Sequence, residues 1–566
     1  MSYYPLLCSL LLCWTALPAQ SPGWQAELDH TAGLITTVEA NGRSFEQSLS
    51  LVGEEAEELQ FRTTITEKNG KSNEERFEFH LIDLNARLLR REVRGKVMYL
   101  TIKTDNNLRM IKYYRNDEQE NYRNTFTIAV NDAEAFRVLS DAFEALIKAG
   151  QQQSKLDFSA MDFGQQLAFL QQNIGTVESD GDTYNQELVL GSPQYFLQFK
   201  TNEFTDKKNT AREAHLNLAD LSSKSVKINV VGKKLLVKLG ADKNNRWIKN
   251  YEEGAFANYS NDLEVLVKTT AEARNIIAVL KELIPAATQL ERERLAGMLT
   301  EGTGLAELIG SYVTKVSTGR AEYDQSLRGS CVLELTRETL AEKGASGQEI
   351  FTFNLIDFGK KSATVSSSAN SLSVTLKAKE RRIQHLRDGE LQNYRNTVSL
   401  YVDEVDQAKV LAYLLNEQID SCNAMAADHA YEGRSKEELF EQATALVLDV
   451  ELSSASYQQT LATEEGETCK LQLTQIRSTK NKDIETLYDF SLSDINPKSI
   501  DFVISGKNLS VQLATRKREK VIKEYQGDDD SDYTDRIRIY TNDIEETRTL
   551  VGLLEELTRQ CIEEGN

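Results

Sequence analysis

The sequence predicts an α+β fold: four tandem repeats, each a seven-stranded antiparallel β-sandwich or barrel with an N-terminal helix and a closing C-terminal amphipathic helix. Three observations lead to this prediction. Five sequence markers return in the same order four times along the 566 residues. Within each repeat a helical pattern is followed by period-2 runs and then by a second helical pattern. The composition, 40% hydrophobic and 27% charged residues, is that of a globular chain with several domains.

The repeat is about 137 residues long, and its clearest marker is an aspartate that ends a Phe/Leu-x-Leu-x-Asp pattern. These aspartates are Asp83, Asp220, Asp357 and Asp494. Downstream come a Gly-Lys pair (replaced in the third repeat), an isoleucine, and a tyrosine at Tyr122, Tyr259, Tyr394 or Tyr533. Upstream, an aromatic-x-Gln-x-Leu pattern recurs around Gln47, Gln186, Gln325 and Gln459. We therefore predict domains at 24–150, 164–285, 303–424 and 436–566, each large enough to bury its own core.

The period-2 runs predict seven strands per repeat. In repeat 1 these are Gln47–Leu51, Leu59–Thr66, Arg76–Ile82, Leu88–Val93, Val97–Lys103, Leu108–Tyr114 and Asn124–Val130. The Gly-Lys pair lies between the fourth and fifth strands, where a tight hairpin favours a residue with positive φ. In repeat 3 we expect Asn370 to take that conformation, because Asn tolerates it better than most residues.

An amphipathic helix closes each repeat, with Asp132, Thr270, Glu404 or Asp543 near its start, where acidic and hydroxyl side chains suit a helix N-terminus. In repeat 2 its apolar residues are Ala273, Ile276, Ile277, Leu280, Leu283 and Ile284. Their i, i+3, i+4 spacing gives the helix one apolar face, which the sheet can bury. The linkers 151–164 and 285–302 contain little proline, so we expect them to be partly helical.

Seven strands followed by one amphipathic helix resemble the pleckstrin-homology-like fold, a bent β-sandwich capped at one end by that helix. The resemblance is one of element order, covers nearly the whole chain after residue 23, and carries no diagnostic residue motif. The additional N-terminal helix departs from it. In that family, lipid-headgroup binders use clustered Lys and Arg between the first two strands. The corresponding stretch here, residues 52–58, is acidic, so phosphoinositide binding is not expected.

The first 19 residues have the pattern of a cleaved signal peptide. An apolar run from Leu6 to Leu17 is too short to span a membrane, and Ala19 supplies a small residue at the cleavage site. The region lacks the Lys or Arg that usually precedes such a run. A retained anchor or a misassigned start is the alternative. No later stretch approaches the roughly 20 apolar residues of a transmembrane helix. We therefore expect an exported protein, either periplasmic or secreted.

Four cysteines remain after the leader, and their positions predict two disulfides. Cys331 and Cys469 begin the second strand of repeats 3 and 4, and Cys422 and Cys561 end the closing helices. Repeats 1 and 2 lack both members, as expected if each pair is bonded. The predicted bonds, Cys331–Cys422 and Cys469–Cys561, suit an oxidising compartment. Two pairs of buried free thiols are the alternative.

The recurrent aspartates and tyrosines are the chemistry-bearing residues that the repeats share. Each aspartate ends a strand, where its carboxylate can accept backbone N–H groups and fix a turn. Each tyrosine begins the last strand, where its ring can pack in the core. We interpret both sets as structural; a ligand role for the aspartates, or a peptide- or carbohydrate-contact role for the tyrosines, is the alternative.

No catalytic, cofactor-binding or metal-binding motif is present in the sequence. The five histidines do not fall at equivalent repeat positions, and no CxxC or HExxH pattern occurs. Residues 528–532 alternate carboxylates as calcium loops do, but lack the Gly and bidentate Glu of an EF-hand; we interpret them as a solvated hairpin tip, with a calcium site as the alternative. The net charge of −21 argues against nucleic acid as a partner.

Two functional hypotheses follow. The first is an exported non-enzymatic protein that binds or scaffolds a protein or glycan partner through tandem β-sandwich modules. Edge strands and the groove beside the closing helix are the natural peptide sites of such modules. The second is a hydrolase or carbohydrate-active enzyme in which one repeat has become catalytic. No repeat differs from the others in the way that the second hypothesis requires. The partner, the oligomeric state and the arrangement of the repeats cannot be inferred from the sequence.

Overall fold

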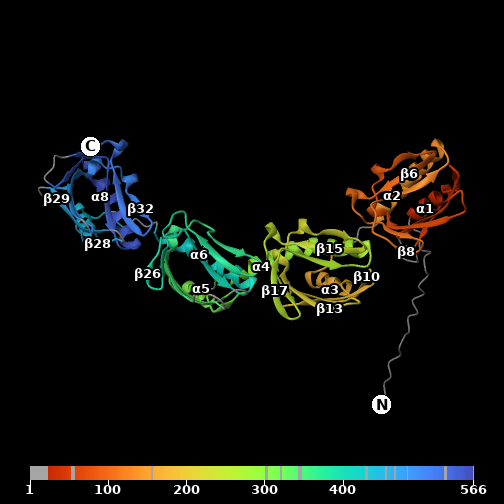
Figure 1. Ribbon diagram of the computed structural model, residues 1–566, viewed down its shortest axis with the longest axis horizontal. Helices are drawn as coiled ribbons and strands as arrows, with labels where there is room; N and C mark the ends of the chain where they lie inside the picture. Colours follow the sequence, from red (N-terminus) through yellow and green to blue (C-terminus); the bar gives the residue numbers. More distant parts are fainter. Residues whose placement is uncertain are drawn as a thin grey trace, which may run out of the picture. The chain divides into compact units, whose positions relative to one another are not determined.

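The computed structural model describes residues 23–52, 58–153, 157–299, 304–318, 321–341, 347–426, 431, 433–452, 455–464, 467–480, 482–527 and 532–564. The predicted signal peptide, most of the acidic stretch 52–58, and residues 528–531 of the Asp-rich loop lie outside these ranges. The chain forms two compact units, one ending at Glu291 and the other beginning at Arg292. Each unit contains two repeats (Figure 1).

The same element order occurs in all four repeats. Repeat 1 consists of α1 (Gly23–Leu34), β1 (Val38–Ala40), β2 (Arg43–Leu51), β3 (Glu58–Thr66), β4 (Ser72–His80), β5 (Arg90–Arg94), β6 (Val97–Lys103), β7 (Lys112–Arg115), β8 (Glu118–Gln119), β9 (Thr125–Val130) and α2 (Ala133–Gln153). Repeat 2 consists of α3 (Phe163–Asn173), β10 (Val177–Ser179), β11 (Asp182–Leu190), β12 (Phe196–Phe204), β13 (Asn209–Asn217), β14 (Lys227–Val231), β15 (Lys234–Gly240), β16 (Ile248–Glu252), β17 (Ala255–Ser260), β18 (Asp262–Leu266) and α4 (Thr270–Gly297).

Repeats 3 and 4 follow the same plan. Repeat 3 consists of α5 (Leu305–Ser311), β19 (Val316–Ser317), β20 (Ala321–Gly329), β21 (Val332–Ala341), β22 (Gly347–Asn354), β23 (Ala363–Ser367), β24 (Leu372–Lys377), β25 (Gln384–Arg387), β26 (Glu390–Leu391), β27 (Thr397–Val402) and α6 (Val405–Ala426). Repeat 4 consists of α7 (Lys436–Ala445), β28 (Val450–Glu451), β29 (Ser456–Glu464), β30 (Glu467–Ser478), β31 (Asp483–Ser491), β32 (Asp501–Ser505), β33 (Asn508–Ala514), β34 (Ile522–Gln526), β35 (Asp532–Thr534), β36 (Arg536–Thr541) and α8 (Ile544–Glu564).

Each repeat contains a six-stranded and a three-stranded antiparallel sheet. In repeat 1 the large sheet has the order β1-β2-β3-β4-β7-β8 and the small sheet the order β5-β6-β9. The tandem β-sandwich prediction is therefore confirmed. The seven predicted strands of repeat 1 correspond to β2–β7 and β9, and the structure adds the short strands β1 and β8. Both are two or three residues long, too short for a period-2 pattern to show.

The two helices of a repeat connect its sheets. In repeats 1, 3 and 4 the N-terminal helix contacts the large sheet, the closing helix contacts the small sheet, and the two helices contact each other. Asp132 and Asp543 cap their closing helices, as predicted, by accepting backbone N–H groups of the first turn. Helix α4 continues through Pro285 to Gly297, so the linker that begins at residue 285 is helical up to residue 297.

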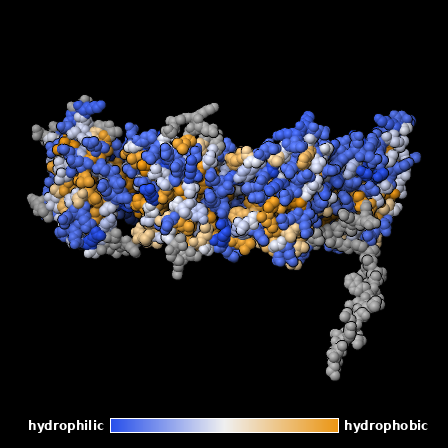
Figure 2. Space-filling view, turned by 90° about the horizontal axis from the view of Figure 1, so that it is seen from below, coloured by the Kyte–Doolittle hydropathy of each residue, from blue (hydrophilic) through white to orange (hydrophobic). Residues whose placement is uncertain are grey.

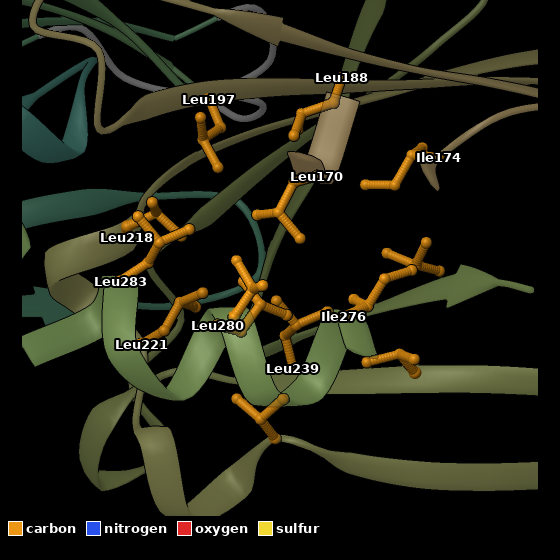
Figure 3. Close-up of a cluster of buried hydrophobic side chains, with 14 of the residues drawn as sticks. Leu170, Ile174, Leu188, Leu197, Leu218, Leu221, Leu239, Ile276, Leu280 and Leu283 are labelled. Atoms are coloured by element: carbon orange, nitrogen blue, oxygen red, sulfur yellow. The ribbon is translucent and has the colours of Figure 1, made fainter. Parts of the chain in front are cut away.

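The apolar periodicity of α4 places its side chains in the core of repeat 2 (Figure 3). Ile276, Leu280 and Leu283 of this helix are buried. They share one cluster with Leu170 from α3 and Leu239 from β15. Burying each such side chain contributes about 1.5–3 kcal/mol, so this helix–sheet contact accounts for a large part of the stability of the repeat.

The Gly-Lys pairs form two-residue hairpin tips, with φ near +60° at Gly95, Gly232 and Gly506. Repeat 3 differs from the prediction, because Asn370 is not among the residues with positive φ. Its tip is four residues long, from Ser368 to Ser371, and the Ser368 hydroxyl closes it by accepting the backbone N–H of Ser371. The longer loop removes the need for a left-handed residue.

Both predicted disulfides are present, Cys331–Cys422 and Cys469–Cys561. Each ties the closing helix of its repeat to the beginning of the second long strand. In the described part of the chain, no helix is long and apolar enough to cross a membrane. Hydrophilic side chains cover much of the face seen in Figure 2, with hydrophobic residues in small groups between them.

Candidate interaction surface between neighbouring repeats

The aspartate of repeat 1 bonds to repeat 2. Asp83 is the last residue of a 3₁₀ turn, Leu81–Asp83, and its side chain is 3% exposed. Both carboxylate oxygens lie 2.6 Å from a guanidinium nitrogen of Arg274, the fifth residue of helix α4. Burial raises the pKa of Asp83, and the charge and hydrogen bonds of Arg274 oppose that rise. This buried ion pair therefore joins two repeats.

The same bond recurs in the second unit. Asp357 ends the equivalent 3₁₀ turn, and Arg548 is the fifth residue of α8. Arg548 donates to both oxygens of Asp357, at 3.1 and 2.6 Å. Burial lowers the pKa of Arg548, but the bond and charge of Asp357 raise it by more. A second guanidinium, that of Arg382, donates to Asp357 at 3.2 Å. The sequence separation is 191 residues in both units, so the bond is part of the repeat plan.

The recurrent tyrosine completes each joint. The backbone N–H of Tyr122 donates to the carbonyl of Gly232 in repeat 2, and Tyr394 donates to Gly506 in the same way. The buried Tyr122 side chain belongs to the core cluster of repeat 2. Burial raises its pKa, and burial raises the pKa of Tyr394 to about 12. The tyrosine of one repeat therefore packs into the repeat that follows.

Apolar and aromatic contacts surround the second joint. Tyr394 of repeat 3 packs with Leu509 and Ile544 of repeat 4. The guanidinium carbon of Arg382 lies 4.2 Å from the ring centroid of Phe502, and that of Arg548 lies 5.6 Å from it. A cation held over a ring in this way adds attraction to the ion pair.

Each joint has two sides. We call the surface of a repeat that bears its recurrent aspartate and tyrosine the "carboxylate face". We call the surface that bears the arginine of the closing helix and the hairpin glycine the "arginine face".

These findings extend the interpretation of the predicted residues. The hydrogen bonds of Asp83 and Asp357 go to arginine, whereas the sequence predicts bonds to backbone N–H groups. The turn is instead capped by the residue three positions earlier, for example Asn354, which accepts the N–H of Ile356. Asp220 and Tyr259 of repeat 2 are buried. In repeat 4, Asp494 is exposed and Tyr533 is 44% exposed.

The tyrosines lie outside the last strand, contrary to the prediction. Tyr122 and Tyr394 precede β9 and β27, and Tyr259 and Tyr533 lie in the short strands β17 and β35 of the large sheets. The chain crosses from the large to the small sheet here, which places the ring at the border of the repeat. The sequence prediction missed the arginines, although a basic residue recurs at the same position in all four closing helices. The fifth residue of the closing helix is Arg137, Arg274, Lys409 or Arg548.

The recurrent glutamine has a structural role inside each repeat. The side-chain amide of Gln186 on β11 donates to the carbonyls of Gly175 and Leu266, and its oxygen accepts the backbone N–H of Leu266. Because β11 is in the large sheet and β18 in the small one, this side chain links the sheets. Gln47, Gln325 and Gln459 make the same three bonds in their repeats.

A cleft of about 850 Å³ lies beside the second joint. Its lining includes Asp357 and Arg548 from the joint, Asp420 from the closing helix α6, and the side chains of Lys360 and Lys379. Both lysines are exposed, and neither has an ion pair within the described part of the chain. A smaller cleft of about 440 Å³ adjoins the first joint and is lined by three lysines, Lys112, Lys233 and Lys268. Each joint therefore carries a groove lined by lysines, of which Lys360, Lys379 and Lys268 are exposed.

A polar cluster lies in the interior of repeat 3. Glu349 accepts hydrogen bonds from Arg337 at 2.6 Å and Arg387 at 3.2 Å, and lies 3.0 Å from Nε2 of His385. Burial lowers the pKa of His385, and the charge of Arg395 lowers it further against the opposing bond to Glu349. Glu349 therefore has three polar partners, all within repeat 3.

Among the described residues, no group of three or more His, Cys, Asp or Glu side chains is placed to hold a metal ion. Most of the Asp-rich loop, the sequence candidate for calcium, falls outside the described residues. Comparisons with models of known protein families, with curated proteins and with solved structures find no match for this chain. The site is therefore interpreted from its geometry alone.

Proposed function

We propose that the protein is an exported, non-enzymatic scaffold whose modules are locked in pairs to bind a macromolecular partner. The observation that carries this proposal is the use made of the recurrent polar residues. Asp83 and Asp357 bond to the next repeat, and the recurrent glutamines bond across the sandwich. Residues that recur because they hold modules together support a structural rather than a catalytic role.

Export is supported by the two disulfides, which persist in oxidising compartments. The order of strands followed by one amphipathic helix supports a pleckstrin-homology-like module, with an additional N-terminal helix. The acidic net charge of −21 disfavours nucleic acid.

The cleft beside the second joint is the proposed binding surface, for a protein or glycan partner with anionic groups. Its exposed cations, Lys360 and Lys379, are free to pair with such groups, and the groove runs beside the closing helix α6. Because the cleft is built from two repeats, its shape depends on the Asp357–Arg548 bond.

The test is cross-linking of the mature protein in its own compartment, followed by mass spectrometry, with a charge-reversed variant. Lys360→Glu with Lys379→Glu should reduce cross-links to the partner at least tenfold. Lys207→Glu with Lys480→Glu reverses two exposed cations on hairpins of repeats 2 and 4 and should leave them unchanged. Equal loss in both variants, or no partner above background for the wild type, would contradict the proposal.

A further inference from the structure

We propose that copies of this chain associate head to tail, the carboxylate face of repeat 4 on one copy binding the arginine face of repeat 1 on the next. The proposal rests on the two joints found inside the chain and does not depend on the identity of a binding partner. The residues of both faces lie in the described part of the chain, and the polar residues of each face are exposed within their own unit.

The carboxylate face of repeat 4 has its joint residues exposed. Asp494 stands at the position of Asp83 and Asp357, and it is exposed. Tyr533 is 44% exposed, whereas Tyr122 and Tyr394 are 3% exposed in their joints. The residue before the recurrent isoleucine is also open in repeat 4, since Val521 is 43% exposed. In repeat 3 that position is Arg382, which contacts Phe502 of repeat 4.

The arginine face of repeat 1 is open in the same way. Arg137, the fifth residue of α2, has a side chain that is 68% exposed, against 22% for both Arg274 and Arg548. Its ion pair is with Glu134 of the same helix, three residues away. A surface pair of this kind contributes little, so Arg137 can exchange it for a carboxylate of another molecule at small cost.

The apolar part of the joint is present on repeat 1 as well. Gly95 forms the hairpin tip with φ +62°, as Gly232 and Gly506 do. The third residue after this glycine is buried in the joined repeats, at Leu235 and Leu509, whereas Met98 is only partly buried.

Two residues before the hairpin glycine, Val93 is 57% exposed. Its counterpart Ile504 in repeat 4 packs against the cluster that contains Tyr394. Repeat 1 therefore presents the arginine, the glycine carbonyl and an uncovered apolar patch for a tyrosine.

Sequence differences between the repeats favour repeat 1 over repeat 3 as the partner of the carboxylate face of repeat 4. In repeat 3 the arginine is replaced by Lys409, and the hairpin glycine is absent from the tip Ser368–Ser371. Repeat 1 keeps both Arg137 and Gly95, as the two joined repeats do. The faces at the two ends of the chain thus have the residue types of the joints that the structure shows.

The proposed contact is heterologous, because it pairs two different faces rather than one face with itself. Such contacts do not close on a dimer and can extend into chains of molecules or close into rings. Inside the chain the joint is helped by the tether between repeats, which acts as an effective concentration in the mM range. Between chains that help is absent, so association should rise with protein concentration.

The test is sedimentation velocity of the mature chain from about 1 μM to about 1 mM, where an untethered joint should become populated. The weight-average mass of the wild type should increase with concentration. Asp494→Arg and Arg137→Asp should each stay monomeric, because like charges then meet at the joint. An equimolar mixture of the two variants restores opposite charges and should associate again. Lys148→Asp, on the same helix as Arg137 and also exposed, should associate like the wild type.

The rescue by mixing separates a head-to-tail joint from general loss of solubility or folding. A wild type that is monomeric over the whole range would overturn the proposal. So would an oligomer that persists in both single variants, because it would use other surfaces. Failure of this test would leave the binding cleft of repeats 3 and 4 untouched, since that cleft uses neither Asp494 nor Arg137.

Discussion

At the scale of the residue, one glutamine side chain in each repeat hydrogen-bonds to backbone groups at the edge of the small sheet, where the two sheets of the sandwich meet. Gln186 is buried and satisfies three backbone groups, including both groups of Leu266 on the small sheet. A buried N–H or C=O left without a partner costs about 1–3 kcal/mol, which explains why an amide with one acceptor and two donor hydrogens stands here in every repeat.

We expect Gln186→Leu to destabilise repeat 2 by about 3 kcal/mol, because the shape is retained while three backbone groups lose their partner. Urea unfolding followed by Trp247 fluorescence, in a Trp24→Phe background, measures the effect. Glu187→Leu, at the adjacent exposed position, should change stability by less than about 0.5 kcal/mol. Equal effects of the two substitutions would show that the amide bonds are unimportant.

His385 gives repeat 3 a dependence on pH. Its ring is buried and stacks on Phe351 with centroids 4.5 Å apart. The pKa of His385 is lowered in the folded state, so the unfolded chain takes up the proton first as the pH falls below 6.5. The contribution of neutral His385 to the free energy of unfolding is therefore fully present above pH 6.5. It is lost as the pH falls toward the pKa of His385 in the folded state.

We expect the melting temperature of the second unit to fall between pH 7.5 and pH 5.5 by more in the wild type than in His385→Tyr. Tyrosine is the matched substitution because Tyr113 stacks on Phe77 at the equivalent place in repeat 1. Differential scanning calorimetry at both pH values measures the difference. Parallel pH profiles for the two proteins would contradict the assignment.

At the scale of the element, the closing helix is fastened differently in the two units. Its eighteenth residue is Gly150 or Ala287 in repeats 1 and 2 and Cys422 or Cys561 in repeats 3 and 4. A Cβ placed on Gly150 would lie 2.6 Å from Leu81, so α2 approaches the 3₁₀ turn too closely for a larger side chain. Repeat 1 thus packs the helix closely against the turn, and repeats 3 and 4 bond it to a strand.

We expect a reductant to lower the unfolding temperature of repeats 3 and 4 and to leave that of repeats 1 and 2 unchanged. Each bond spans 91 or 92 residues, for which the chain-entropy model gives about 4–5 kcal/mol. Calorimetry with and without reductant measures this, and repeats 1 and 2, which contain no cysteine, serve as the internal control. Movement of all transitions together would indicate a general effect of the reductant.

The sequence was informative where a pattern repeats and where residues act locally. The order of elements, the apolar face of α4, the hairpin glycines and the cysteine pairs follow from periodicity and spacing. The partner of Asp83 lies 191 residues away, and no local pattern indicates a contact at that distance. Only the positional recurrence of Arg137, Arg274 and Arg548 could have shown it.

At the scale of the whole molecule, the central feature is a joint that uses the same residues in both units. An exposed ion pair would hold two modules weakly, but a buried pair whose partner is removed costs about 3–5 kcal/mol. Asp83 and Asp357 belong to buried ion pairs, since both side chains are 3% exposed. Each unit is therefore expected to behave as a rigid pair of repeats and not as two independent modules.

The most direct test is residue-resolved hydrogen exchange at the N–H of Tyr394, which donates across the joint to Gly506. The account predicts that this amide is protected in the wild type and exchanges at least tenfold faster in Arg548→Ala, a factor equivalent to about 1.4 kcal/mol. Arg559→Ala, farther along α8, should leave the rate unchanged, because Arg559 pairs only with glutamates of its own helix within the described residues. An unprotected Tyr394 amide in the wild type, or the same exchange rate in Arg548→Ala, would contradict the joint.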